Sequence, residues 1–251
     1  MSVVDDLIHL ARAVGEPHRE LAILGEGNVS ARIDDERMLV KASGASLAAT
    51  GPDDLVEVRL APILELLHDA NASDDRVAEV LMGARVDPTA KRPSIEGLLH
   101  AVVMSLGAQA ACHTHPVAVN AIICSDRAEA LLDGPLFPDQ IVVLGPEQLM
   151  VPYLDPGLGL GLAMHAALTE FRDRTGALPR LTYLRNHGIF AIGQSPAECL
   201  RITEMAVKVA KIMHGVLAIG RPQHLPAAVV DRIETRPDEH LRRRVLDGRA
   251  G

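Results

Sequence analysis

Aromatic side chains are scarce in this 251-residue sequence, which contains no Trp, two Tyr and three Phe. Proteins that bind single-stranded nucleic acid stack bases on aromatic rings, so this mode of recognition is not expected here. Apolar residues nevertheless make up 48% of the chain, and aliphatic packing must therefore form the core. A chain of this length suits one large domain or two small ones and buries most of the surface that its unfolded form exposes.

Positive charge is also sparse. The formal net charge is −8, and the one run of basic residues, at 242–244, lies among Asp and Glu residues. Nucleic acids are bound through clustered Lys and Arg side chains, so this composition predicts no nucleic-acid partner. We interpret the basic run as the solvated face of a helix.

Cysteine is limited to Cys112, Cys124 and Cys199. Three widely spaced cysteines predict neither a disulfide framework nor a CxxC metal site, and they fit a reducing compartment. No run of eighteen apolar residues could cross a bilayer, and the first ten residues carry two Asp where a secretory leader would be basic and then apolar. We therefore expect a soluble, cytoplasmic protein without a membrane partner.

Two histidines stand two residues apart at the end of an apolar stretch. If residues 108–115 form a strand, His113 and His115 project from the same face, because side chains alternate along a strand. Pro116 cannot donate to a strand ladder, so the strand should end there, and α/β proteins usually build their sites at the carboxyl ends of strands. The pair predicts a metal clamp, although a polar strand end that happens to hold two histidines explains it equally well.

Two glycine-rich turns flank a predicted hairpin. Residues 25–33 lead into its first strand and 38–42 form the return strand, which the turn Ser43-Gly44 follows at once. Asn28 and Ser43 lie in loops at the ends of these strands, where backbone N–H groups could surround an anion. Two ordinary turns explain the spacing more simply.

A predicted helix begins after Pro93. Ser94 is a plausible N-cap, and apolar residues recur at helical spacing up to Gly107. Glu96 would then lie in the first turn of this helix, shortly before the histidine strand. Its carboxylate could serve a site, or it could only stabilise the helix end through the helix dipole.

The rest of the chain alternates between helical and extended patterns. Apolar periodicity and breakers predict helices at 3–14, 76–83, 117–124, 126–132, 157–174, 195–215 and 237–246, and strands at 56–60, 141–144, 181–184 and 189–193. Asn186-His187-Gly188 forms a tight turn between the last two strands, where backbone freedom lets an imidazole be aimed. Glycines at 157, 159 and 161 have the spacing GxGxG rather than GxGxxG, which argues against a dinucleotide site and favours close packing of a helix on the sheet.

Three histidines at predicted strand ends and one glutamate at a helix start make up a candidate ligand set. Nitrogens of His113, His115 and His187 with an oxygen of Glu96 match a Zn²⁺ site whose carboxylate substrate can displace. Their spacing along the chain leaves open whether the four side chains converge.

Five motifs occur in the order, and at roughly the distances, of one known family. They are Gly27-Asn28-x-Ser30, Ser43-Gly44, Pro93-Ser94-x-Glu96, His113-x-His115-Pro116 and Asn186-His187-Gly188. Between about residues 7 and 216 the sequence resembles the class II aldolase/adducin family, which includes sugar-phosphate aldolases, epimerases, decarboxylases and the non-enzymatic adducin heads. Residues 40–44, 92–96 and 113–117 look most like the aldolase portion of rhamnulose-phosphate aldolase/dehydrogenase fusion proteins.

The resemblance implies an α/β fold, a single three-layer α/β/α sandwich on a mixed, largely antiparallel sheet. The composition divides this domain further: it would span residues 1–220, with the polar, breaker-rich stretch around 61–92 as a peripheral insertion and the Pro- and charge-rich residues 221–251 as a C-terminal extension. The chain would assemble into a homotetramer with sites at subunit boundaries, and its partner would be a small sugar or sugar phosphate.

The resemblance also implies roles for individual residues. His113, His115 and His187 would bind one zinc ion per chain, and Glu96 would be a ligand and then the catalytic base. The phosphate would be held by Asn28, Ser43, Gly44 and Ser94.

Two departures from the family pattern bear on the substrate. Ile95 stands where fuculose-phosphate aldolase has a second phosphate-binding serine, so either Lys41 compensates or the substrate carries no phosphate. Residues 136–140 contain no tyrosine to match that aldolase's proton donor, and Tyr153 matches a different family position, where a structural role is expected.

The ligand set and the resemblance together predict a zinc-dependent aldolase. Cleavage or formation of a C–C bond beside a ketose carbonyl requires stabilisation of an enediolate, which zinc held by neutral imidazoles can provide, while a displaced carboxylate acts as base. A metal-dependent sugar-acid phosphate decarboxylase or sugar-phosphate epimerase is the alternative. A non-catalytic adducin-like binding domain is a second alternative, which the three histidines disfavour because adducin-like heads lack them.

Overall fold

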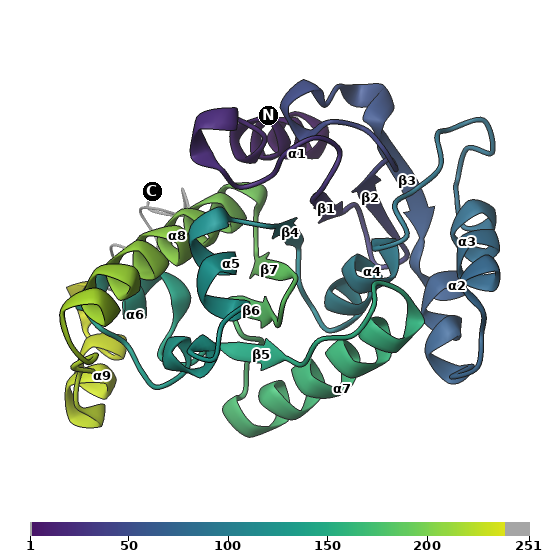
Figure 1. Cartoon of the computed structure of the whole chain (residues 1–251). Helices are drawn as coiled ribbons and strands as arrows, with labels where there is room; N and C mark the ends of the chain where they lie inside the picture. The colour runs from purple at the N-terminus through teal and green to yellow at the C-terminus, as the bar shows by residue number, and fades with distance from the viewer. Residues whose placement is uncertain (1, 239–251) are drawn as a thin grey trace.

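Among the described residues, seven strands form one sheet, with the histidine-bearing strand at its centre (Figure 1). The computed structural model describes residues 2–238. The strands are β1 (Asn28–Arg32), β2 (Arg37–Lys41), β3 (Leu55–Arg59), β4 (Ala110–Thr114), β5 (Leu149–Val151), β6 (Leu181–Leu184) and β7 (Gly188–Gly193). Their order is β3-β2-β1-β4-β7-β6-β5, and neighbours run antiparallel except for the parallel pair β5 and β6. The sheet is therefore mixed and largely antiparallel, as predicted.

Helices of very different length connect the strands. They are α1 (Val3–Val14), α2 (Leu60–Glu65), α3 (Asp74–Gly83), α4 (Gly97–Ser105), α5 (Val117–Ile123), α6 (Pro138–Leu144), α7 (Leu158–Thr175), α8 (Pro196–Ile219) and α9 (Ala227–Glu234). Short 3₁₀ turns occur at Pro17–Arg19, Leu47–Ala49, Pro52–Asp54, Leu66–His68 and Ala128–Leu131. The last of these turns stands where a helix at 126–132 was expected.

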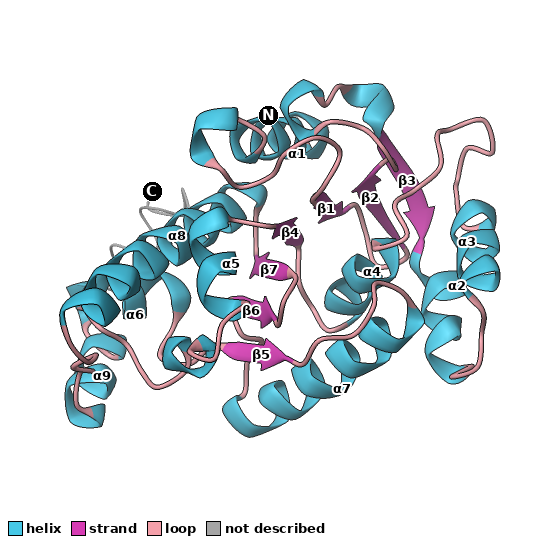
Figure 2. Ribbon diagram, viewed as in Figure 1, coloured by secondary structure: helices cyan, strands magenta, loops and turns pink. Residues whose placement is uncertain are grey.

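The helices cover both faces of the sheet and produce three layers (Figure 2). One face packs against α1, α5 and α8, and the other packs against α2, α4 and α7. The two cores alternate along β4, because Ala110 and Cys112 lie in the first and Ala111 lies in the second. The predicted three-layer sandwich is confirmed.

Residues 141–144 are helical, so the predicted strand there is wrong. Pro138 opens α6 at a position where its fixed φ suits a helix, and Gly145 ends the helix with a φ of 82°. Ile141 and Val142 pack against α9, whereas Leu144 lies in the core shared with α8. A four-residue apolar run that is buried on more than one side has no visible period. The strand in this region is β5, which the sequence analysis did not predict.

The polar stretch at 61–92 contributes to the core at the β3 side of the sheet (Figure 1). Neither α2 nor the two first residues of α3 were predicted. Buried apolar side chains of this stretch share a core with α4 and α7, and they are Ile63, Leu66, Val77, Leu81 and Ala84.

The C-terminal part of the described chain packs on α6. Val230 and Ile233 of α9, a helix that was not predicted, contact Ile141 and Val142. The predicted helix at 237–246 lies outside the described residues, apart from its first two positions.

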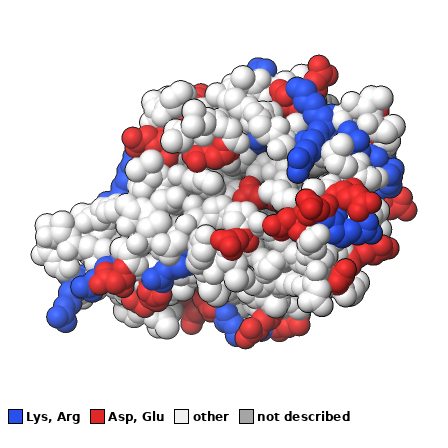
Figure 3. Space-filling view, turned by 45° about the vertical axis from the view of Figure 1, so that its right-hand side comes forward, with Lys and Arg blue, Asp and Glu red and all other residues white. Residues whose placement is uncertain are grey.

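The surface and the helices agree with the composition. No helix within residues 2–238 is both long and apolar enough to span a membrane. On the face that Figure 3 displays, Lys and Arg side chains are interspersed with Asp and Glu. Cys112, Cys124 and Cys199 are all free.

Gly161 allows α7 to approach α4 closely. A Cβ at this position would lie 2.7 Å from Cδ2 and 3.0 Å from Cγ of Leu98, which is buried in α4. Gly161 therefore packs on a helix, whereas the prediction was that these glycines pack on the sheet. Gly159, two residues earlier, faces open space.

We expect Gly161→Ala to lower the free energy of unfolding by about 1–3 kcal/mol, because the added methyl group must displace Leu98. Gly159→Ala is the matched control, and it should be neutral or stabilising by up to about 1 kcal/mol, since alanine favours a helix. Urea unfolding of both variants measures the difference. Equal effects would contradict the proposed close contact.

Candidate metal centre

The alternation of side chains along the central strands builds one wall of the site. Asn28 of β1 pairs with His113 of β4, and His113 pairs with Phe190 of β7. Side chains alternate along β1, and Val29 faces the α1 side of the sheet. Asn28 and Ser30 therefore face the other side, toward α4. Phe190 stacks on the His113 ring at a centroid distance of 5.4 Å and an interplanar angle of 19°. The Phe190 ring therefore supports the fully buried His113 ring.

The start of α4 supplies the carboxylate. Glu96 is the N-cap residue of α4, and the Ser94 hydroxyl accepts from the Glu96 backbone N–H at 3.3 Å. The prediction that Ser94 caps the helix and that Glu96 lies in its first turn is therefore wrong by two residues. The reason is that residues 94–97 form a separate turn, closed by a bond of 2.9 Å from Gly97 N to Ser94 O.

His115 and His187 come from segments beyond the strands. β4 ends at Thr114, so the predicted strand is one residue too long and His115 lies just beyond it. Its ring nevertheless lies beside that of His113, as predicted, with the ring centroids 4.8 Å apart. His187 lies in the turn between β6 and β7, next to Asn186, which has a positive φ of 55°. A Cβ at Gly188 would lie 2.4 Å from the Thr114 carbonyl oxygen and 2.6 Å from Cδ2 of His115. Only glycine allows this turn to meet the histidines.

The three imidazoles converge on one point. Their ligand atoms all lie within 4.8 Å of one another, and Nε2 of His113 is 3.0 Å from Nε2 of His115. Oε1 of Glu96 lies 3.3 Å from Nε2 of His113 and 3.3 Å from Nε2 of His187. Ligands about 2.05 Å from a tetrahedral zinc ion are roughly 3.3 Å apart. The donor set and these separations fit a zinc ion.

The second nitrogen of each imidazole has a different environment. Nδ1 of His113 lies 2.8 Å from the carbonyl oxygen of Ile189, which can only accept, so Nδ1 carries the proton and Nε2 is free to bind a metal. Nδ1 of His115 lies 3.2 Å from Oε2 of Glu26. Nδ1 of His187 is buried and has no hydrogen-bond partner among the described residues.

Burial and mutual proximity perturb the site's ionisation. Burial, together with the neighbouring imidazoles of His113 and His187, lowers the pKa of His115 to about 4. Burial alone would raise the pKa of Glu96, but His113 and His187 hold it well below its usual value. Burial likewise opposes protonation of His113, whereas the Glu96 carboxylate raises its pKa. At neutral pH the site therefore contains an ionised carboxylate and at least one neutral imidazole.

The two predicted anion loops meet beside this cluster. Ser43 and Gly44 are exposed, and Gly44 has a positive φ of 74°. The Ser43 backbone N–H already donates to the Arg92 carbonyl oxygen at 2.8 Å. Nζ of the buried Lys41 donates to the carbonyl oxygens of Gly25, Ala42 and Ala45 at 3.5, 3.3 and 2.7 Å. Lys41 therefore links the loop that contains Gly25 to the loop that contains Ser43 and Gly44.

Asn28 contacts Glu96, the predicted catalytic base, directly. Its side-chain amide donates to Oε2 of Glu96, the oxygen that does not face the histidines. The structure thus brings Asn28, Glu96 and the three histidines together.

Two residues near the site were missed by the sequence analysis. Glu26 contacts His115. The sequence feature that could have pointed to it is an acidic residue within a glycine-rich motif. His100, one turn after Glu96 on α4, is fully buried, and its Nδ1 lies 2.5 Å from the Ser30 hydroxyl. Burial and the nearby His113 lower the pKa of His100 to about 3. The i, i+4 spacing of Glu96 and His100 would have placed both on one helix face.

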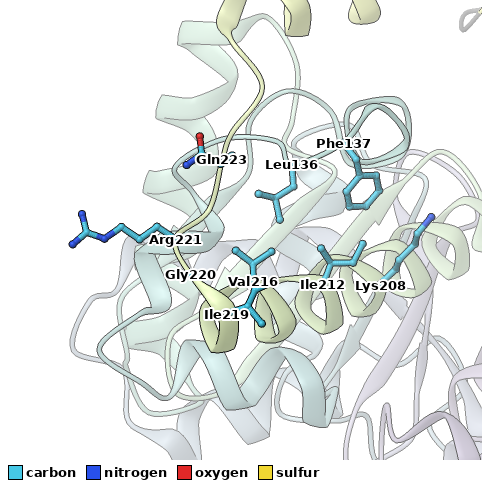
Figure 4. A pocket seen from close by; sticks show the side chains of 9 residues that line it. All are labelled: Leu136, Phe137, Lys208, Ile212, Val216, Ile219, Gly220, Arg221 and Gln223. Carbon is cyan, nitrogen blue, oxygen red and sulfur yellow. The ribbon is translucent and has the colours of Figure 1, made fainter.

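A hollow of about 670 Å³ lies elsewhere, along the C-terminal half of α8 (Figure 4). Apolar side chains of Leu136, Phe137, Ile212 and Val216 point toward it. None of its lining residues belongs to the histidine cluster.

Comparison with known proteins gives a consistent result. A family model described as "Class II Aldolase and Adducin N-terminal domain" matches residues 5–214. The "Uncharacterized oxidoreductase YuxG" of Bacillus subtilis is 25% identical over 216 residues, which make up 83% of this chain but only 29% of that protein. The "3-oxo-tetronate 4-phosphate decarboxylase" of Haemophilus influenzae is 23% identical over 209 residues, 82% of this chain and 84% of that protein.

The fold also has counterparts among solved structures. A structure named "L-fuculose 1-phosphate aldolase" matches with a TM-score of 0.69 at 19% identity, over 92% of this chain and 94% of that chain. This likeness establishes the fold.

The close approach at Gly188 leads to a prediction. Gly188→Ala should reduce zinc affinity about 10-fold or more, because the new methyl group must push the turn away from His113 and His115. Gly215→Ala in α8, where a Cβ meets nothing, is the control and should bind zinc normally. Competition with a chromogenic chelator measures both affinities, and unchanged binding by Gly188→Ala would contradict the geometry.

Proposed function

The chain belongs to the class II aldolase and adducin family, and we propose that it is a zinc-dependent aldolase that cleaves or forms a C–C bond in a ketose phosphate or a related sugar. The observation that carries this proposal is the position of Oε1 of Glu96, 3.3 Å from Nε2 of both His113 and His187. This carboxylate can complete a metal site and can also leave it when substrate oxygens arrive.

In the proposed mechanism, His113, His115 and His187 would hold the ion through Nε2. Bound zinc would supply a Lewis acid that stabilises the negative charge of an enediolate. Glu96 accepts the proton of the substrate's carbon at Oε1, while the Asn28 amide holds Oε2 and keeps the carboxylate aimed at the site. The Ile189 carbonyl oxygen retains the proton of His113 on Nδ1.

A phosphate or another anionic group would bind at the loop of Ser43 and Gly44, with Ser94 and Asn28 beside it. Lys41 lies beneath this loop, where the residue is 1% exposed and its ammonium group donates to three carbonyl oxygens. Lys41 would therefore favour an anion by its field and by ordering the loops, without direct contact.

A sugar-acid phosphate decarboxylase is the second candidate. It is favoured by the similarity to the Haemophilus influenzae 3-oxo-tetronate 4-phosphate decarboxylase, which extends over 84% of that protein. Decarboxylation also generates an enediolate-like anion that the same ligand set would stabilise. A sugar-phosphate epimerase would use the same chemistry, whereas an adducin-like binding domain leaves the three converging histidines unexplained.

The cytoplasmic location and the homotetramer stay predictions. Ile23 and Leu24, in the loop that precedes β1, are 62% and 91% exposed and are suited to contact another copy of the chain. Sedimentation at four times the 26.9 kDa chain mass would agree with this assembly.

The zinc-loaded protein should turn over one substrate class in a panel of ketose 1-phosphates and 3-oxo sugar-acid phosphates. Release of an aldehyde and a ketone fragment from the former supports the aldolase. Carbon dioxide from the latter alone would replace it by the decarboxylase. Turnover of neither class, with zinc bound, would contradict both.

We expect about one zinc ion per chain, and His113→Ala or His187→Ala should lower zinc affinity by several orders of magnitude while the chain stays folded. Elemental analysis after dialysis and circular dichroism measure the two properties. His214→Ala is a suitable control because His214 lies on α8 and contacts the Ala118 carbonyl oxygen instead. Full zinc occupancy in both site variants would refute the ligand assignment.

Glu96→Gln separates a catalytic base from a helix-end charge. Glutamine is nearly isosteric but cannot accept the proton, so turnover should fall about 10²–10⁴-fold while the histidines retain zinc. A purely helix-stabilising carboxylate would change stability by about 0.3–1 kcal/mol and leave turnover nearly intact. Exchange of the substrate's carbon-bound proton with deuterated water reports this step directly. Wild-type exchange in the zinc-loaded variant would eliminate Glu96 as base.

A further inference from the structure

His115 is the one histidine of the cluster that the sheet and its turns do not hold. The ladder between β4 and β7 ends with Thr114 and Ile189, one residue before His115. The His115 backbone N–H donates instead to the carbonyl oxygen of Leu21 at 2.8 Å. The Val117 backbone N–H donates to the backbone carbonyl oxygen of Glu20 at 3.0 Å. The loop at 20–26 therefore fixes the backbone of this residue.

The same loop also contacts the His115 side chain. Oε2 of Glu26 lies 3.2 Å from Nδ1 of His115, and Oε1 of Glu26 accepts from the Ile23 backbone N–H at 2.7 Å. The Glu26 backbone N–H returns a bond of 3.2 Å to the Ile23 carbonyl oxygen. Both oxygens of the Glu26 carboxylate are thus engaged, and the side chain is 30% exposed.

The three imidazoles consequently differ in what faces their Nδ1 atoms. His113 has a neutral carbonyl oxygen, His187 has no partner in the described part of the chain, and His115 has a carboxylate. A carboxylate acceptor keeps the proton of the imidazole on Nδ1, fixes the ring orientation and increases the basicity of Nε2. His115 is therefore the one imidazole of the cluster whose Nδ1 faces a carboxylate among the described residues, so its ring orientation and tautomer depend on Glu26.

We propose that Glu26 is a positioning residue that sets the metal affinity of the site by holding His115 through Nδ1. The proposal rests on the proposed function, because it requires that the histidine cluster binds a divalent metal. It also gives a chemical reason for an acidic residue within the glycine-rich turn at 25–27, which the anion-loop interpretation of that turn leaves unused.

The test compares zinc affinity in Glu26→Gln, Glu26→Ala and Glu20→Gln. Glu20 is exposed, lies in the same loop and makes no side-chain hydrogen bond or ion pair among the described residues, so Glu20→Gln removes the same charge without touching His115. Affinity is measured by competition with a chelator. We expect Glu26→Gln to bind zinc about 10-fold more weakly and Glu26→Ala up to about 100-fold more weakly, because the glutamine oxygen still accepts from Nδ1. Glu20→Gln should match the wild type.

A second readout separates positioning from general stability. The visible spectrum of the Co²⁺-substituted protein should change in Glu26→Gln, since the ligand field depends on the His115 donor, while thermal unfolding of the metal-free protein stays within a few degrees of the wild type. Unchanged zinc affinity in Glu26→Gln and Glu26→Ala would overturn the proposal, as would an equal loss in Glu20→Gln. A wild-type protein that binds no zinc would instead refute the proposed function.

Discussion

A carboxylate placed among three imidazoles, one fully buried and two partly buried, is the interaction on which this structure depends. The Glu96 side chain is 12% exposed, and removing an ionised carboxylate from water costs several kcal/mol unless other groups compensate. Compensation comes from the Asn28 amide, from Nε2 of His113 and His187, and from the N-terminus of α4. A divalent cation at the same point would compensate more fully, because it would interact with all three imidazoles and the carboxylate together.

The fold brings these groups together from distant parts of the chain. His113 lies on the central strand, Asn28 on its neighbour and His187 in the turn that enters the strand on the other side. The α4 helix packs over this face, and its N-cap residue Glu96 reaches the histidines at the strand ends. Two glycines permit the convergence: a Cβ at Gly27 would lie 2.9 Å from the His113 carbonyl oxygen, and one at Gly188 would clash with Thr114. Positions far from the chemistry, such as Gly161, permit the close packing that holds α4 in place.

Much of the architecture was predictable because its signals are local or belong to the family. The period of α1, the cap of α8 at Ser195 and the alternation in β1 and β2 all appear in the structure at or near the expected positions. The candidate ligands His113, His115 and His187 were recognised from motifs, and they converge.

The errors have physical causes. The helix at residues 141–144 was mistaken for a strand because its side chains are buried against α9 and α8 on different sides, which leaves no period in the sequence. A short apolar run without a period fits either a helix or a strand. Glu26 and His100 were missed because their importance lies in contacts with His115 and Ser30, and a single sequence does not show such long-range pairs. The part of Lys41 in anion binding stays a prediction, but its contacts with backbone carbonyl oxygens could not be predicted, because only the folded loops bring those oxygens to Nζ.

X-ray absorption at the zinc edge tests the central claim most directly, because it counts the ligands of the ion without requiring a known substrate. The proposed site predicts three imidazole nitrogens at about 2.0–2.1 Å with one carboxylate oxygen at a similar distance, and no sulfur. In Glu96→Gln the three imidazoles should stay and the carboxylate contribution should disappear. A first shell with fewer than three imidazoles, or one unchanged by Glu96→Gln, would contradict the account.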